Sequence, residues 1–357
     1  MSDDVIDNYD LDNNALFIRG CNLIDIADEN RYLQNAWFAL IGNLLNEEQM
    51  DLLIQNTNAE LQKTDPTAKL QAMHQLINVL PSFGLKQRFM MLLSQVEVSA
   101  AQGKVMAPVS DGDCLKIILL MPWIIALACS SQQFSDLPAI ENCNTLELAF
   151  WLVLTSKEAS SNSDIDVLCG GMSLLLGGFG IVTPTTTMVR FIISTKSDVI
   201  SALIGGFCAT GPAHMGACKY AIMRLSGILH EIEAGNFEAA VTHYCKDKLW
   251  LGFGHPIMQW DGRVDFFFSR FQVPMCPFNS LVRSISDNTG LQPNVDFLIA
   301  SIMSKHRASP ELGLLAFFVC RMPILLAHYQ ARFSAHSFGL SSKDLREKYK
   351  KVSQLWL

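Results

Sequence analysis

The chain has 357 residues, of which 50% are hydrophobic and 17% are charged, and its formal net charge is −7. This length predicts two or three domains. The charged fraction is below the ~25% of an average globular protein, so much surface is expected to be buried in a helical core or at a subunit interface. The negative charge argues against general nucleic-acid binding, although a local basic pocket for a carboxylate remains compatible with it.

Helical periodicity dominates the chain. A short strand is expected at Ala15–Arg19, and Asn46-Glu-Glu-Gln has the pattern of a cap that opens a helix. Further helices are expected, in chain order, at Gln34–Leu45, Thr67–Leu80, Leu115–Cys129, Leu146–Thr155, Val167–Gly178, Met188–Gly206 and Ala217–Ala234. Because β-branched alternation is scarce, we predict an all-α fold, with a loop at Gln102–Asp113 and a linker-like segment at Ser156–Asp164.

Two apolar runs resemble membrane spans in composition. Ile117–Cys129 is interrupted by Pro122, and Leu312–Tyr329 carries Arg321 near its centre. Both are shorter than the ~20 residues that a span needs, so buried helices are expected instead. The acidic first residues do not have the pattern of a signal peptide. We therefore expect a cytoplasmic protein with no membrane partner.

Ten cysteines are scattered along the chain without a CxxC pair. Most lie in apolar contexts, such as Cys129 in IIALACS and Cys320 in FFVCRM. Free thiols in a reducing compartment are the expected state, and neither a disulfide framework nor a metal site is predicted.

Three segments flanked by turn residues each present one ionisable side chain. They are GPAHMGA with His214, GFGHP with His255, and PNVDF with Asp296. A histidine at a helix N-terminus is expected to be neutral, and a carboxylate among apolar neighbours is expected to have a raised pKa. One carboxylate base with two histidines can enolise a carbonyl compound and activate an electrophile. Each histidine taken alone is more often structural than catalytic.

The order and spacing of these three segments resemble those of the citrate synthase family, and several other segments match that family as well. His255 follows His214 by 41 positions, and Asp296 follows His255 by 41 positions. Arg321 lies 25 positions after Asp296, where that family has a substrate arginine. The other matching segments span nearly the whole chain: Leu16–Gly20 with Asp25, Ala36–Gly42, Asn46–Glu48, Thr185–Arg190 and Ala327–Tyr329.

The resemblance implies a two-domain helical fold and a homodimer. Residues 1–218 and 312–357 would form a large domain, and residues 219–311 a small domain that closes over the active site. A homodimer would agree with the low charged fraction.

The resemblance also implies a role for each motif residue. Asp296 would remove a proton from an acyl-CoA, His214 would stabilise the enol, and His255 would activate a 2-oxo acid. The remaining positions would bind the acceptor through Arg263, Arg321 and Arg190, and the adenine of CoA through Leu251, Gly252, Phe253 and Gly254. The acyl-CoA would be a substrate, and no permanently bound cofactor is implied.

Structural roles remain open for Arg321 and Arg263, and for Cys218 beside the first histidine segment. Arg321, among apolar residues, needs a partner to offset its desolvation, and that partner is either a bound carboxylate or an acidic side chain. Arg263, in WDGRVD, could lie in a solvated turn. Cys218 fits packing better than nucleophilic chemistry.

The sequence departs from the family pattern where the acceptor would bind. Gly180 stands in place of an acceptor-binding histidine, and Ser341 in place of an arginine that the partner subunit supplies in relatives. Further departures are Met258 for a tyrosine, Gly262 for a proline and Met215 for a glycine. An acceptor other than oxaloacetate is therefore expected, such as a longer 2-oxo acid, an amide or the phosphonate phosphonopyruvate.

Positive charge near the C-terminus, at Lys343, Arg346 and Lys348, either replaces the missing arginine or belongs to a solvated helix face. Two alternatives to a synthase also stay open. The same site run backwards would make a citryl-CoA-type lyase, and a catalytically silent relative would bind CoA only.

Overall fold

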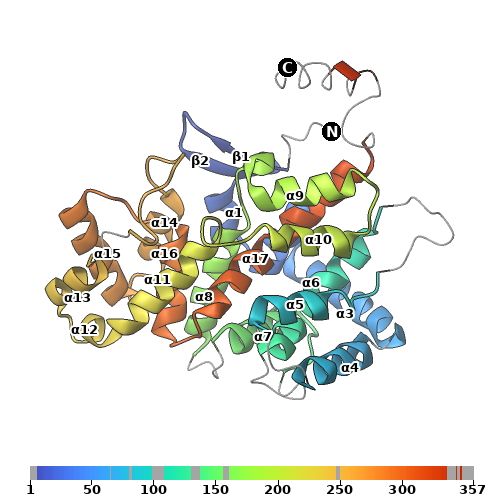
Figure 1. Ribbon diagram of the computed structural model, residues 1–357, viewed down its shortest axis with the longest axis horizontal. Coiled ribbons are helices and arrows are strands. Elements are labelled where there is room, and N and C mark those ends of the chain that lie inside the picture. Colours follow the sequence, from blue (N-terminus) through green and yellow to red (C-terminus); the bar gives the residue numbers. More distant parts are fainter. Residues whose placement is uncertain are drawn as a thin grey trace, which may run out of the picture.

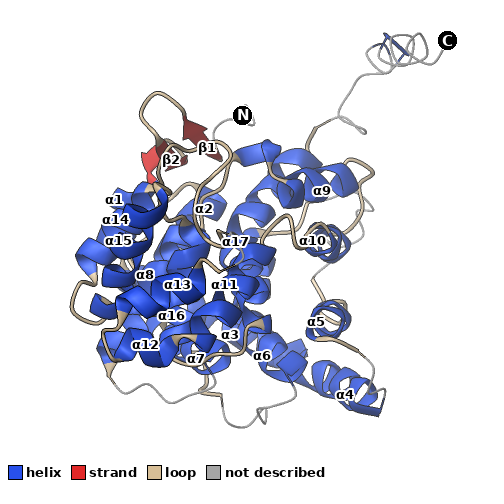
Figure 2. Ribbon diagram, turned by 60° about the vertical axis from the view of Figure 1, so that its left-hand side comes forward, coloured by secondary structure: helices blue, strands red, loops and turns tan. Residues whose placement is uncertain are grey.

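The computed structural model describes residues 6–64, 66–79, 83–98, 108–129, 137–155, 161–246 and 250–335, together with 343, 346 and 347. Helices form nearly all of the regular structure in these ranges, which confirms the predicted all-α fold (Figures 1 and 2). Half of the predicted loop Gln102–Asp113 and more than half of the predicted linker Ser156–Asp164 lie outside the described residues, as do Ser341 and Lys348. The described ends of both segments, residues 111–113 and 162–164, are helical, so the predicted loop and linker are wrong there.

A small antiparallel sheet precedes the helices. Its strands are β1 (Asp7–Asp10), β2 (Ala15–Ile18) and β3 (Cys21–Asn22), in the order β1-β2-β3. The β1–β2 turn is held by the Asp10 carboxylate, which accepts from the backbone N–H of Asp12 at 2.9 Å and of Asn13 at 3.1 Å. Only β2 was expected from the sequence. The other two strands are too short for an alternating pattern to show.

The helices follow in chain order. They are α1 (Leu23–Glu29), α2 (Tyr32–Ile41), α3 (Glu47–Thr64), α4 (Pro66–Val79), α5 (Leu85–Leu93), α6 (Asp111–Cys129), α7 (Cys143–Thr155), α8 (Asn162–Leu175), the 3-10 turn η3 (Gly180–Val182), α9 (Pro184–Ile193), α10 (Val199–Cys208), α11 (Gly216–Gly227), α12 (Leu229–Glu233), α13 (Phe237–Tyr244), α14 (Gly262–Arg270), α15 (Cys276–Thr289), α16 (Val295–Lys305) and α17 (Glu311–Phe333). The predicted cap before α3 is confirmed, because Asn46 and Gln49 exchange backbone–side-chain hydrogen bonds of 3.0 and 2.9 Å.

Two predicted helices are each divided in the structure. The expected helix Met188–Gly206 is α9 and α10, because Lys196 takes a left-handed conformation (φ 63°) and Asp198 caps α10 by accepting from Ser201 N–H at 2.8 Å. Such a backbone conformation cannot continue a right-handed helix. Ala217–Ala234 is likewise α11 and α12.

Helix α17 forms the centre of the core. It contacts α2, α6, α8, α9, α10 and α11, and Figure 1 shows it running through the middle of the molecule. Helices α6 and α17 are long and apolar enough to cross a membrane, yet 78% and 94% of their most apolar windows are buried inside the protein. Burial of this kind is what a core helix has. All ten cysteines are free, as expected.

Helices α12 to α15 gather at one end of the molecule, and α4 and α5 lie at the other end (Figures 1 and 2). Helices α11 and α16 pack against each other, and α11 also packs against α17. This packing brings the starts of α11, α14 and α16 toward the central helix. The division into a large domain and a small domain at residues 219–311 stays a prediction.

Candidate active site

One cavity of about 230 Å³ brings together five of the predicted site residues. We call it the His214 cavity. Its ionisable side chains come from the turns before α11 and α14, from the first turns of α14 and α16, and from the middle of α17. The full lining consists of Phe179, Val182, Thr183, Pro184, His214, Met215, His255, Pro256, Ile257, Arg263, Val295, Asp296, Phe317 and Arg321.

His214 lies in a tight turn that the sequence sets up with glycine. Gly211 and His214 exchange two backbone hydrogen bonds of 2.9 Å, and Met215 adopts φ 62° immediately before α11. A side chain at Gly216 would place its Cβ 2.5 Å from the Gly211 carbonyl oxygen, so only glycine fits there.

The imidazole of His214 is neutral and available. Its Nε2 is buried and has no hydrogen-bond partner among the described residues. Burial, assisted by the charge of Arg321, lowers the pKa of His214 to about 4. The predicted neutral state is therefore confirmed, but it follows from desolvation and a neighbouring cation rather than from the helix N-terminus alone.

His255 is fixed in one tautomer by the backbone. The N–H groups of Ile257 and Met258 donate to its Nδ1 at 3.2 and 3.0 Å. Because Nδ1 accepts, the proton of the neutral ring is on Nε2. Burial and then Arg263 lower the pKa of His255, and the Phe179 ring stacks on the imidazole with centroids 5.0 Å apart. His255 can therefore donate a hydrogen bond from Nε2.

Asp296 has the environment of a base. Its Oδ1 is buried and has no hydrogen-bond partner among the described residues. Burial raises the pKa of Asp296 to about 6, although Arg321 and the backbone N–H of Cys218 oppose that rise. The predicted direction is confirmed. The Cys218 thiol is itself buried, and burial raises its pKa far above the ordinary value, as expected for a packing residue.

The turn before His255 is tied to the start of α16. Gly254 N–H donates to Gln292 O at 2.7 Å, and Asn294 N–H donates to Gly252 O at 2.8 Å. Gly252 has φ 77°, and a Cβ there would lie 2.7 Å from Phe297. These bonds fix the position of the turn that carries His255 relative to the first turn of α16, which carries Asp296. The assignment of residues 251–254 to the adenine of CoA stays a prediction.

Arg321 enters the cavity as an unpaired cation. It is only 8% exposed, and its Nε donates to Leu175 O at 3.4 Å. None of the described carboxylates has an oxygen within 4.0 Å of the Arg321 guanidinium, the limit for an ion pair. Burial, and then the charge of Arg263, lowers its pKa to about 10. Of the two partners expected for this arginine, a bound carboxylate fits the structure better than an acidic side chain.

Arg263, by contrast, is paired. Its Nε and Nη2 donate to the two oxygens of Asp261 at 2.8 and 2.7 Å, and both side chains are buried. The alternative of a solvated turn is therefore wrong. Asp261 also accepts from Val295 N–H at 3.0 Å, which links α14 to α16. Sequence analysis did not single out Asp261, although its position two residues before Arg263 suits a capping residue.

Arg190 does not line the cavity. Its Nη1 lies 3.3 Å from His328 Nδ1, while His328 Nε2 contacts Asp7 Oδ1 at 2.7 Å. The buried Asp7 carboxylate also accepts from the N–H groups of Gly178 and Gly180 at 3.1 and 3.2 Å. Asp7 was missed because no motif surrounds it. The predicted substrate role of Arg190 has no support in this geometry.

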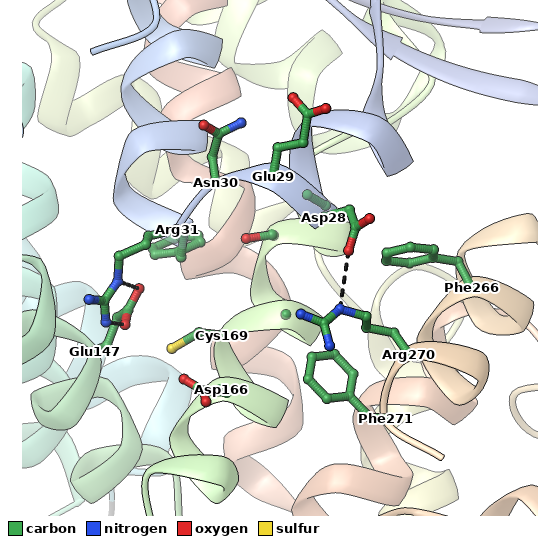
Figure 3. Close-up of a pocket in the computed structure, with 14 residues that line it drawn as sticks. Asp28, Glu29, Asn30, Arg31, Glu147, Asp166, Cys169, Phe266, Arg270 and Phe271 are labelled. Carbon is green, nitrogen blue, oxygen red and sulfur yellow. Dashed lines mark hydrogen bonds and ion pairs between the residues drawn. The ribbon is translucent and has the colours of Figure 1, made fainter. Parts of the chain in front are cut away.

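A second cavity, of about 350 Å³, is lined in part by Phe266 and Arg270, further along α14 than Arg263. We call it the Arg31 cavity. Figure 3 shows its two arginines turned onto carboxylates: Arg31 pairs with the buried Glu147, and Arg270 lies 3.1 Å from Asp28. None of the predicted site residues lines it. Size alone therefore does not identify the site.

The comparisons with known proteins concern the family and the fold. The family model for the citrate synthase C-terminal domain matches residues 5–337. A 2-methylcitrate synthase from Corynebacterium glutamicum is 26% identical over 239 residues, which make up 62% of this chain and 58% of that protein. The chain thus matches less than two thirds of the length of this curated relative.

Solved citrate synthases share the fold. The ternary complex of the Thermoplasma acidophilum enzyme with carboxymethyl coenzyme A and oxaloacetate aligns with 94% of this chain and 91% of that chain, at a TM-score of 0.71 and 18% identity. The Pyrobaculum aerophilum enzyme aligns with 96% and 89%, at a TM-score of 0.67 and 19% identity. Because the family model spans nearly all of the sequence, the chain belongs to the citrate synthase family.

Proposed function

We propose that the protein condenses acetyl-CoA, or another short acyl-CoA, with a 2-oxo acid. The observation that carries this proposal is the meeting of three groups in the His214 cavity: a carboxylate with a raised pKa and two neutral imidazoles. Two of these groups, His214 and Asp296, keep a buried polar atom without a partner among the described residues. Unmet hydrogen-bonding atoms of this kind are expected where a ligand completes the site.

Enolisation is assigned to Asp296 and His214. Asp296 takes a proton from the acyl-CoA carbon next to the thioester, and its pKa of about 6 makes it a stronger base than an ordinary aspartate. His214 Nε2 donates a hydrogen bond to the thioester oxygen as negative charge develops there. Because burial keeps this imidazole neutral, it stabilises the enol by donating a hydrogen bond rather than by transferring a proton.

Carbon–carbon bond formation is assigned to His255 and Arg321. The enol carbon attacks the 2-oxo carbon of the acceptor, and His255 donates its Nε2 proton to the oxygen that becomes an alkoxide. Arg321 holds the neighbouring carboxylate of the acceptor. Water then cleaves the thioester, so that CoA leaves as the thiol.

The test is exchange of the acyl-CoA methyl protons with deuterated water, together with thiol release in the presence of 2-oxo acids. Asp296→Asn should abolish both signals, because the amide cannot act as the base. The matched control is Asp28→Asn in the Arg31 cavity, which should retain both signals. Full exchange in the Asp296 variant would exclude this residue as the base, and binding of acyl-CoA without either reaction would favour a silent CoA-binding protein.

We also propose a homodimer. Four large apolar side chains around η3 and α9 are exposed in the single chain: Ile181 (49%), Val182 (72%), Met188 (38%) and Phe191 (69%). A cluster of exposed apolar residues beside a site is a common feature of a subunit interface. Light scattering of the purified protein should give twice the chain mass, and Phe191→Lys should lower it. A monomer at micromolar concentration would contradict this proposal.

A further inference from the structure

Among the described residues that line the His214 cavity, Arg321 is the one cation without an ion pair. Arg321 has no carboxylate within ion-pair distance among the described residues, whereas Arg263 is already held by both oxygens of Asp261. A paired guanidinium has less charge to offer a second anion, and breaking this buried pair would leave Asp261 uncompensated. The described part of the cavity can therefore balance one acceptor carboxylate, which belongs on Arg321.

The backbone leaves no room for a further donor at position 180. Gly180 lies between the lining residues Phe179 and Val182, with φ 57°, and a Cβ there would lie 2.9 Å from the Asp7 carbonyl oxygen. The Asp7 carboxylate occupies the backbone N–H groups of Gly178 and Gly180. Its negative charge is close enough to Arg321 to act on that guanidinium. This region therefore disfavours a second anionic group rather than binding one.

The rest of the lining is largely apolar. The side chains concerned are Phe179, Val182, Pro184, Met215, Pro256, Ile257, Val295 and Phe317. An alkyl group placed among them loses contact with water and gains dispersion contacts. A carboxylate placed there would lose its hydration without a counter-charge.

Given the condensation proposed above, we infer that the acceptor is a 2-oxo acid with a single carboxylate and an apolar side group. Its carboxylate binds Arg321, its oxo group faces His255, and its alkyl group lies on the apolar lining. The enol carbon bonds to the 2-oxo carbon, the oxo oxygen gains a proton, and water replaces CoA on the acyl carbon. The products are a 2-alkyl-2-hydroxybutanedioate and free CoA.

A pair of acceptors with matched shapes tests this inference. Oxaloacetate and 4-methyl-2-oxopentanoate differ in having a carboxylate or an isopropyl group at the same carbon. Thiol release by the full chain with acetyl-CoA should show a kcat/KM higher for the isopropyl compound by about tenfold or more. Pyruvate and 2-oxobutanoate, with smaller alkyl groups, complete the series. A higher kcat/KM for oxaloacetate would overturn the inference.

Asp261→Asn tests the charge argument separately. The amide oxygen can still accept from Val295 N–H, but the charge that holds Arg263 is gone. The preference should move toward oxaloacetate by about tenfold, because Arg263 can then bind a second carboxylate. An unchanged ratio in a folded variant would contradict the role given to this pair. If the melting curve shows that the variant does not fold, the inference is decided by the ratio of kcat/KM for 4-methyl-2-oxopentanoate and oxaloacetate in the unaltered protein.

The outcomes separate this inference from the proposed function. Condensation with dicarboxylic acceptors only would leave the function in place and overturn the acceptor assignment. Methyl-proton exchange that depends on Asp296, without thiol release from any monocarboxylic acceptor, would do the same. Neither exchange nor thiol release would overturn both.

Discussion

The two cavities that are lined by residues of α14 differ in how their charged groups are satisfied. In the Arg31 cavity both arginines are turned onto carboxylates, so the protein completes its own ion pairs. In the His214 cavity Arg321 is buried without an ion pair, and His214 Nε2 and Asp296 Oδ1 are buried without a hydrogen-bond partner, among the described residues. Burial of unsatisfied groups costs stability, and proteins retain it where a ligand supplies the missing contacts. The smaller cavity is therefore the better candidate site.

The largest expected effect concerns His214. His214→Phe removes the donor to the enol oxygen and should lower kcat by about 10²–10³-fold. Its counterpart in the other cavity is Tyr32→Phe, because the Tyr32 hydroxyl is also buried without a hydrogen-bond partner among the described residues. Steady-state thiol release measures both. Tyr32→Phe should retain full activity and should not lower the melting temperature, since it removes an unsatisfied group. Equal losses in the two variants would remove the distinction between the cavities.

The second effect separates the unpaired arginine from a paired one. Arg321→Gln should raise the KM for the 2-oxo acid by about ten- to a hundredfold, because a charge-assisted bond to the carboxylate contributes about 1.5–3 kcal/mol. Arg270→Gln breaks an exposed pair with Asp28 and should change KM less than about twofold. The acceptor dependence of thiol release gives both values. If Arg321→Gln changed kcat but left KM unaltered, the assignment of Arg321 to ground-state binding would be wrong.

A pH profile tests whether the cavity carboxylate is the base. Asp296 must be ionised to accept a proton, and its pKa is raised to about 6. The value of kcat/KM should therefore fall about tenfold per pH unit below 6 and level off above it. Burial lowers the pKa of both histidines, that of His214 to about 4, so above pH 6 both rings are neutral and the acidic limb reports Asp296. A profile with its acidic limb near pH 4 would indicate a base with an ordinary environment.

The smallest effect on activity is expected in the Arg31 cavity, where the change should affect stability instead. Arg31→Gln leaves Glu147 buried without its cation and should lower the free energy of unfolding by about 1–3 kcal/mol, with kcat unchanged. Burial already raises the pKa of Glu147, so its protonation favours the folded variant at low pH. Urea unfolding should accordingly show a smaller loss at pH 5 than at pH 8. A loss that is the same at both values would contradict the ionised state of Glu147.

Local sequence signals predicted most of the helices, although α14, which carries Arg263, was not among them. Apolar periodicity marked the core helices, and Asn46 with Gln49 marked the cap before α3. The break at Lys196 was missed, although Asp198, which caps α10, is a local signal for the start of a new helix. The flanking glycines and proline marked His214 and His255, since those turns require specific backbone conformations.

The sequence by itself thus singled out His214, His255 and Asp296 as candidate site residues, and its periodicity determined the all-α fold. Only the tertiary structure decided which charges are paired. Asp261 neutralises Arg263 from two residues away, while Asp7 reaches Gly180 and His328 from the far end of the chain. Arg321 is left unpaired because packing around α17 keeps the described carboxylates out of ion-pair distance. Pairing depends on distances of a few ångströms between segments far apart in sequence, which composition and spacing do not contain.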